Sequence, residues 1–196
     1  MSIPPKEEVA RIIESRAQTL VDLALGGWDR WMNNPEKAQL YRRTRACLVH
    51  NYIMLDAISK FERDGGVHVI NGQETALFLI EDQLLVRIKK GDERGLSSNV
   101  ATQAALAFND PEELLFDLPY VWRIDVAYVL NSLETRIDQI VAVARDEDRI
   151  VWALPLYPNS AADSAPVQLP VQPTEPRAPD SAMRVPGVER DKRNRG

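Results

Sequence analysis

The hydrophobic period of this chain changes once, near residue 65, and that change constrains the fold more than any other feature. Before it, apolar residues such as Val9, Ile12 and Leu20 recur at the three- and four-residue intervals of an amphipathic helix. After it, short apolar runs follow the period of two that is typical of strands. Helices followed by strands, rather than alternating with them, indicate an α+β fold and not a doubly wound one.

The helical part is expected over residues 1–64, with three helices. Glu7 and Glu8 favour the first turn of the first helix, because acidic side chains suit the positive end of the helix dipole. Gly26-Gly27 is predicted to end that helix. A short second helix should follow at 28–31, and a third over 35–61.

The sheet part is expected over residues 65–156. Asn71-Gly72 is the best hairpin signal in the chain. Short polar connectors between the later runs favour antiparallel pairing. One helix, capped by Ser98 or Asn99 and ending at Phe108, should interrupt the sheet. The prediction is therefore N-terminal helices packed on a mostly antiparallel sheet with strands at 67–70, 75–80, 84–90, 122–130, 137–144 and 150–156.

The composition changes again near Tyr157, where proline begins to recur every few residues. A segment with so little apolar content cannot offset the entropy of ordering, so a disordered proline-rich tail is expected over 157–196. Residues 1–156 should form a single folded domain.

Charge and cysteine content limit the function classes. The net charge of −5 disfavours general nucleic-acid binding, although a local basic patch is compatible with it. The single cysteine, Cys47, excludes an internal disulfide and favours a reducing compartment. The charged start of the chain is unlike a signal peptide, and no apolar run approaches the roughly 20 residues that span a bilayer. We expect a cytoplasmic protein without membrane contact, metal or cofactor.

The first candidate site lies in the predicted third helix. Arg43, Arg45 and His50 have spacings that resemble the ribonuclease motif of HEPN helical domains, in which arginine orients phosphate and histidine handles a proton. Ala46 stands where that motif usually has a polar residue. The alternative is a half-buried structural histidine, because Arg43, Cys47 and His50 fall on one helical face.

The second candidate is an anion site where a strand ends in two lysines and a helix begins. A helix N-terminus offers free N–H groups to an anion, and neighbouring lysines would add positive charge. The alternative is an ordinary capped helix beside lysines that protect a sheet edge. The residues of this site are Lys89, Lys90, Ser98, Asn99, Thr102 and Gln103.

A third possibility is a metal-dependent nuclease, because Glu74, Asp82 and Lys89 fall across a predicted hairpin. Such a site needs an acidic residue two positions before the lysine, and Arg87 stands there, so this possibility is discounted. His68 is interpreted as structural.

Several blocks together resemble a group of small uncharacterised bacterial proteins found beside helix-turn-helix regulators and metallopeptidase-like partners. The resemblance covers about residues 38–156, and Ala127 replaces a usual glycine. It implies a toxin–antitoxin or prophage module and carries no catalytic role. The blocks are Arg43-Thr44-Arg45-Ala46, Arg87-Ile88-Lys89-Lys90 with Ser98-Asn99 and Thr102-Gln103, Ala127-Tyr128-Val129-Leu130, and Trp152-Ala153-Leu154-Pro155-Leu156.

The leading hypothesis is a toxin-like interaction protein that inhibits a host process by binding a nucleic acid or a nucleic-acid enzyme. Its protein partner would be an antitoxin or a host protein. One alternative is a ribonuclease that uses an Arg/His pair. Another is a non-toxic regulatory or antitoxin-like binding protein that works through its tail.

Overall fold

The computed structural model describes residues 3–72, 75–97, 108, 121–146 and 149–158. Within these residues three α-helices precede six β-strands, so the α+β prediction is confirmed. The predicted tail lies outside the described residues from 159 onward, as does the predicted helix over 98–108 except for Phe108. None of the helices in the described part of the chain is long and apolar enough to cross a membrane.

The helices are α1 (Lys6–Ile13), α2 (Ala17–Met32) and α3 (Arg42–Phe61). A 3-10 turn, η1 (Glu14–Arg16), separates α1 from α2, and a second, η2 (Lys37–Gln39), precedes α3. Each helix buries an apolar stripe, as its sequence period predicts. The predicted start of the third helix near residue 35 is wrong, because Tyr41 is still extended, with ψ 156°, and α3 begins after it.

The prediction that Gly26-Gly27 ends a helix is also wrong, since α2 runs through both glycines and includes Trp28 and Trp31. A Cβ atom on Gly27 would lie 2.4 Å from Cγ1 of Ile53, so the glycine allows α2 and α3 to approach closely. The packing of the two helices therefore outweighs the low helix propensity of glycine.

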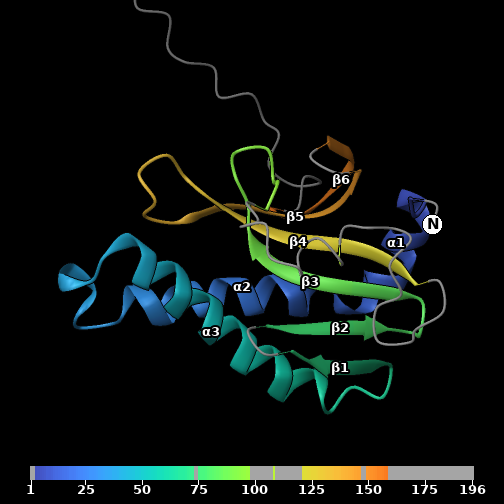
Figure 1. Ribbon diagram of the computed structural model, residues 1–196, viewed down its shortest axis with the longest axis horizontal. Helices are drawn as coiled ribbons and strands as arrows, with labels where there is room; N and C mark the ends of the chain where they lie inside the picture. Colours follow the sequence, from blue (N-terminus) through green and yellow to red (C-terminus); the bar gives the residue numbers. More distant parts are fainter. Residues whose placement is uncertain (1–2, 73–74, 98–107, 109–120, 147–148, 159–196) are drawn as a thin grey trace, which may run out of the picture. The chain divides into compact units, whose positions relative to one another are not determined.

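The six strands form one sheet in which spatial order follows chain order from β1 to β6 (Figure 1). Their bounds agree with the predicted strands to within two residues at each end. The strands are β1 (Val67–Asn71), β2 (Ala76–Ile80), β3 (Leu84–Lys90), β4 (Trp122–Leu130), β5 (Ile137–Asp146) and β6 (Arg149–Tyr157).

The sheet is mostly antiparallel, as predicted, with one parallel pairing between β3 and β4. In that pairing Leu84 lies beside Trp122, and Lys90 lies beside Tyr128. A parallel pair requires a long crossover between its strands, and residues 91–121 supply it.

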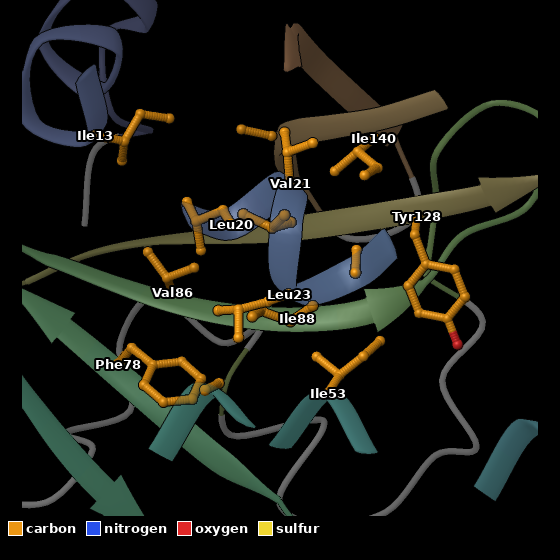
Figure 2. Close-up of a cluster of buried hydrophobic side chains, with 14 of the residues drawn as sticks. Ile13, Leu20, Val21, Leu23, Ile53, Phe78, Val86, Ile88, Tyr128 and Ile140 are labelled. Carbon is orange, nitrogen blue, oxygen red and sulfur yellow. The ribbon is translucent and has the colours of Figure 1, made fainter. Parts of the chain in front are cut away.

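Strand alternation gives the sheet two different faces. On the face toward the helices, Val86 and Ile88 of β3 belong to the same buried core as Leu20 and Leu23 of α2 and Ile53 of α3. Figure 2 shows these side chains gathered around the strands. The opposite face has two smaller apolar clusters. One includes Leu85 and Val121, and the other consists of Ala127, Val141 and Val143.

Candidate functional site

Three basic side chains from separate segments converge on one carboxylate. Oε1 of Glu134 accepts hydrogen bonds from Nη2 of Arg42 at 2.5 Å and from Nζ of Lys90 at 2.8 Å. Oε2 of Glu134 accepts one from Nη2 of Arg45. The start of α3, the end of β3 and the β4–β5 turn therefore meet at this group, which we call the basic cluster (Figure 1).

The turn that carries Glu134 is held by its own hydrogen bonds. Oδ1 of Asn131 accepts from the backbone N–H of Thr135 at 2.7 Å, and the backbone N–H of Glu134 donates to the Asn131 carbonyl at 2.8 Å. Glu134 has φ 51°, a left-handed conformation that is uncommon outside glycine. The turn therefore fixes the carboxylate in front of α3 at a cost in backbone energy.

The position of Lys90 follows from the alternation of β3. Val86, Ile88 and Lys90 share the face toward the helices, whereas Arg87 and Lys89 lie on the opposite face. The two lysines predicted to form one anion site are thus on different faces of the sheet. Lys90 joins the basic cluster, and Lys89 does not.

The start of α3 is itself built against the usual helix rules. Tyr41, its N-cap residue, makes no side-chain capping hydrogen bond, and the first turn has no acidic residue. Arg42, Arg43 and Arg45 instead place positive charge at the positive end of the helix dipole, which is unfavourable. Glu134 supplies from another element the negative charge that the sequence of the helix lacks.

The ion pairs change the protonation equilibria of the cluster. The hydrogen bond from Arg42 is the largest cause that lowers the pKa of Glu134, from an ordinary 4.5 to about 2, with further contributions from Lys90 and Arg45. The same contact raises the pKa of Arg42. Glu134 is consequently ionised at neutral pH, and the three cations exceed it by two formal charges.

A shallow pocket of about 440 Å³ adjoins the basic cluster. Its lining includes apolar residues and side chains of both signs of charge, with Asp92 paired to Arg94 at 3.4 Å. The positive excess therefore comes from the α3 side of the pocket. The lining residues are Arg42, Lys90, Gly91, Asp92, Glu93, Arg94, Val129, Leu130, Asn131, Ser132 and Glu134.

The three residues of the predicted Arg/His site all lie on α3. Arg45 is bonded to Glu134, and Arg43 is exposed at the first turn of α3. Arg43 and His50 share one side of the helix but are separated by two turns, about 10 Å along the axis. His50 is half-buried.

Most of the predicted anion site lies outside the described residues, namely Ser98, Asn99, Thr102 and Gln103. The nearest described residue, Ser97, is buried on the face of the sheet opposite the helices. Its Oγ donates to Oδ2 of Asp125 at 2.7 Å. Strand alternation puts Lys89 on that same face.

The residues of the discounted nuclease site are spread along the sheet. Asp82, in the β2–β3 turn, contacts Nε2 of His68 at 3.2 Å, and both side chains are exposed. Lys89 lies near the other end of β3, roughly 20 Å away at about 3.3 Å per residue. Glu74 lies outside the described residues. In the described part of the chain, no three His, Cys, Asp or Glu side chains are grouped as a metal site requires.

A second polar cluster is buried between the parallel strands. Nε and Nη2 of Arg87 donate to the two carboxylate oxygens of Asp125 at 2.7 and 2.9 Å. Nη1 of Arg145 lies 3.8 Å from Asp125 and 3.3 Å from Oγ of Ser97. The Arg87 guanidinium lies 4.0 Å from the centre of the Phe108 ring. Arg87 and Asp125 are each 2 % exposed, so this pair is part of the interior and does not offer a binding surface.

Sequence reasoning found Arg45 and Lys90, but assigned them to different sites, and it missed Arg42 and Glu134. Glu134 gives no local signal, because it is one acidic residue in a polar connector. The absence of an acidic residue from the first turn of α3 was the one available sign that a partner must come from elsewhere.

Fold and site together define a class: an α+β protein with a six-stranded sheet, one parallel strand pair and a basic cluster at one end of the sheet. No protein-family model, curated protein or solved structure matches the chain.

Proposed function

We propose that this chain is a toxin-like interaction protein that binds nucleic acid through the basic cluster. The observation that carries the proposal is the convergence of Arg42, Arg45 and Lys90 on the single carboxylate of Glu134. Phosphate groups are the natural ligands of a surface where arginine and lysine outnumber carboxylates. The toxin–antitoxin or prophage setting rests on the resemblance of the sequence blocks alone.

Accessibility supports this use of the cluster. The side chain of Arg42 is 76 % exposed and that of Lys90 is 36 % exposed, so both can reach a ligand without unfolding the site. Arg45 is much less exposed and can keep Glu134 neutralised when the other two turn outward. Arg43, exposed beside Arg42, adds a further positive charge.

The site is local, which agrees with the acidity of the whole chain. A net charge of −5 gives little general attraction to nucleic acid, so binding should depend strongly on a few cations. Asp92 and Glu93 on the pocket wall would repel phosphates that approach from that side. The phosphate path should therefore follow Arg42, Arg43 and Lys90 rather than pass over Asp92 and Glu93.

The test is a salt titration of binding to labelled single-stranded RNA, single-stranded DNA and duplex DNA. Arg42→Ala combined with Lys90→Ala should weaken binding and reduce the slope of log affinity against log salt by about 1.4 for single strands, at about 0.7 per phosphate contact. Arg11→Ala combined with Lys60→Ala removes the same charge from exposed positions on α1 and at the end of α3. That control should leave the slope unchanged.

Regulated expression in bacteria separates the proposal from the ribonuclease alternative. Growth arrest that is lost in the Arg42/Lys90 double variant and kept in His50→Ala supports the proposal. Growth arrest lost in His50→Ala but kept in the double variant supports the ribonuclease. Binding without growth arrest removes the toxin role and leaves a nucleic-acid binder, and salt-independent binding or no binding refutes the proposal.

A further inference from the structure

Two exposed apolar side chains flank the Arg42–Glu134 ion pair. Tyr41 is 83 % exposed and Leu133 is 78 % exposed, which makes them the two most exposed large apolar residues in the described part of the chain. Each directly precedes a partner of an ion pair whose Nη2–Oε1 distance is 2.5 Å. Tyr41 and Leu133 are therefore the chain neighbours of the two partners of this ion pair, at one end of the sheet.

At this exposure neither residue contributes much buried apolar area to the core. Buried apolar surface contributes roughly 25 cal/mol per Å², and an aromatic ring left in water forgoes that gain. The N-cap position of α3 also favours serine, threonine, asparagine or aspartate over tyrosine, because those side chains satisfy free N–H groups. Tyr41 thus serves neither the core nor the helix end.

We propose that the basic cluster takes single-stranded nucleic acid, with phosphates on Arg42 and Lys90 and an unpaired base stacked on Tyr41 beside Leu133. This inference rests on the proposed function and names its substrate class. Duplexes hide the faces of their bases within the helical stack, so only an unpaired base can contact an exposed ring. The cation of Arg42 and the ring of Tyr41 come from adjacent residues. One nucleotide can therefore place its phosphate on Arg42 and its base on Tyr41.

The pocket beside the cluster is consistent with the same substrate. Val129 and Leu130 add apolar atoms to its lining, and Asn131 and Ser132 add polar groups. Such a lining suits a flat, partly polar group better than a phosphate, because Asp92 and Glu93 would repel negative charge. A base next to the stacked one can therefore lie over the pocket.

The experiment compares Tyr41→Ala, Tyr41→Phe and Leu55→Ala in the full-length chain. Leu55 is the matched control, because it is another exposed apolar residue of α3, well along the helix from the cluster. The probes are labelled oligothymidylate, oligouridylate and a duplex of oligothymidylate with oligoadenylate. Affinity is measured by fluorescence anisotropy over a range of salt concentrations.

The wild-type protein should bind the single strands about tenfold more tightly than the duplex, as expected for one stacked base. Tyr41→Ala should remove that preference by weakening single-strand binding about tenfold while leaving duplex binding and the salt slope unchanged. Tyr41→Phe and Leu55→Ala should behave like the wild type. A partial loss of preference is expected for Leu133→Ala.

Equal wild-type affinity for single strands and duplex overturns the inference, as does a Tyr41→Ala variant that keeps the preference or weakens all probes equally. In those cases binding persists and still depends on Arg42 and Lys90, so the proposed function stands. Absence of salt-dependent binding to every probe overturns the proposed function and the inference together.

Discussion

At the scale of single residues, Glu134 has a strained backbone conformation, and its carboxylate pairs with three cations. A glutamate with φ 51° costs on the order of 1–3 kcal/mol relative to an ordinary conformation. Its carboxylate is only 16 % exposed and accepts hydrogen bonds from three cations, which offset that cost. Glu134 therefore stabilises the arrangement on which the proposed binding surface depends.

The ion pairs of Glu134 predict a pH-dependent stability. The pKa of Glu134 is about 2 in the folded protein against an ordinary 4.5, so the ionised group stabilises the fold fully above about pH 4.5. That contribution should be lost as the pH falls from about 4.5 toward 2. We expect Glu134→Gln to lower the urea midpoint at neutral pH and to approach the wild-type midpoint near pH 2.

Glu8→Gln is the control, because Glu8 pairs with Arg11 on the exposed surface of α1 at 2.9 Å. Exposed pairs contribute little, so this variant should stay close to the wild type at neutral pH. A difference between wild type and Glu134→Gln that is the same from neutral pH to pH 2 would contradict the prediction.

The residue scale also shows what a sequence can and cannot predict about this site. The separation of Lys89 from Lys90 follows directly from the strand period of two, so it was predictable once 84–90 was assigned as a strand. The meeting of Lys90 with Arg42 and Glu134 was not, because it joins three segments that are far apart in the sequence. Only the pairing of the elements brings them together.

At the scale of elements, the α2–α3 contact explains why two adjacent glycines have different roles. Gly26 has no atom within 4 Å of the place where a Cβ would stand. A Cβ on Gly27 would lie 2.4 Å from Cγ1 and 3.3 Å from the backbone nitrogen of Ile53. Only Gly27 is therefore required by the crossing of the two helices.

Alanine substitutions at the two glycines should change stability in opposite directions. Gly26→Ala should raise the free energy of unfolding by about 0.5–1 kcal/mol, because alanine loses less backbone entropy in a helix. Gly27→Ala should lower it by about 1–3 kcal/mol, because the stiff Ile53 side chain and its backbone cannot move aside freely. Urea unfolding followed by circular dichroism measures both, and changes of equal sign would refute the proposed contact.

Strands were predicted better than helix ends for a physical reason. Most residues of β2, β3 and β4 are buried on both faces of the sheet, so each strand appears in the sequence as a short apolar run, and that signal is local. The continuation of α2 through Gly27 depends instead on close packing against α3, and α3 begins only after the extended Tyr41. Neither is encoded in the propensity of the residues at these positions, so Gly26-Gly27 was predicted to end a helix and the third helix was predicted to begin too early.

At the scale of the whole domain, the sheet consists of two three-stranded antiparallel units, β1–β3 and β4–β6, joined by one parallel pair. Short polar connectors predicted the pairing within each unit. The parallel join was not predictable from local pattern, because it depends on where the long connection over 91–121 returns the chain. The predicted helix within that connection, and the anion site placed on its start, lie outside the described residues.

The Arg87–Asp125 pair lies at this junction, because the two residues are directly opposite each other in the parallel β3–β4 pairing. Ser97, from the connection, and Arg145, from β5, contact the same carboxylate. One buried Asp125 thus links both units of the sheet and the segment between them. Its hydrogen bonds should contribute to fixing which strands pair.

Replacing Asp125 should therefore lower the free energy of unfolding far more than replacing an exposed aspartate that also pairs with an arginine. Asp125→Ala takes away the carboxylate of a buried ion pair, which costs about 3–5 kcal/mol in comparable sites. Asp56→Ala is the matched control, because Asp56 accepts from Arg30 at 2.9 Å but both side chains are more than two-fifths exposed. That loss should be about 1 kcal/mol or less.

Asp125→Asn, which keeps the shape and one acceptor oxygen, should have a stability between those of Asp125→Ala and Asp56→Ala. Urea midpoints rank the three variants, and an Asp125→Ala variant no less stable than Asp56→Ala would show that the buried pair does not hold the two units of the sheet together.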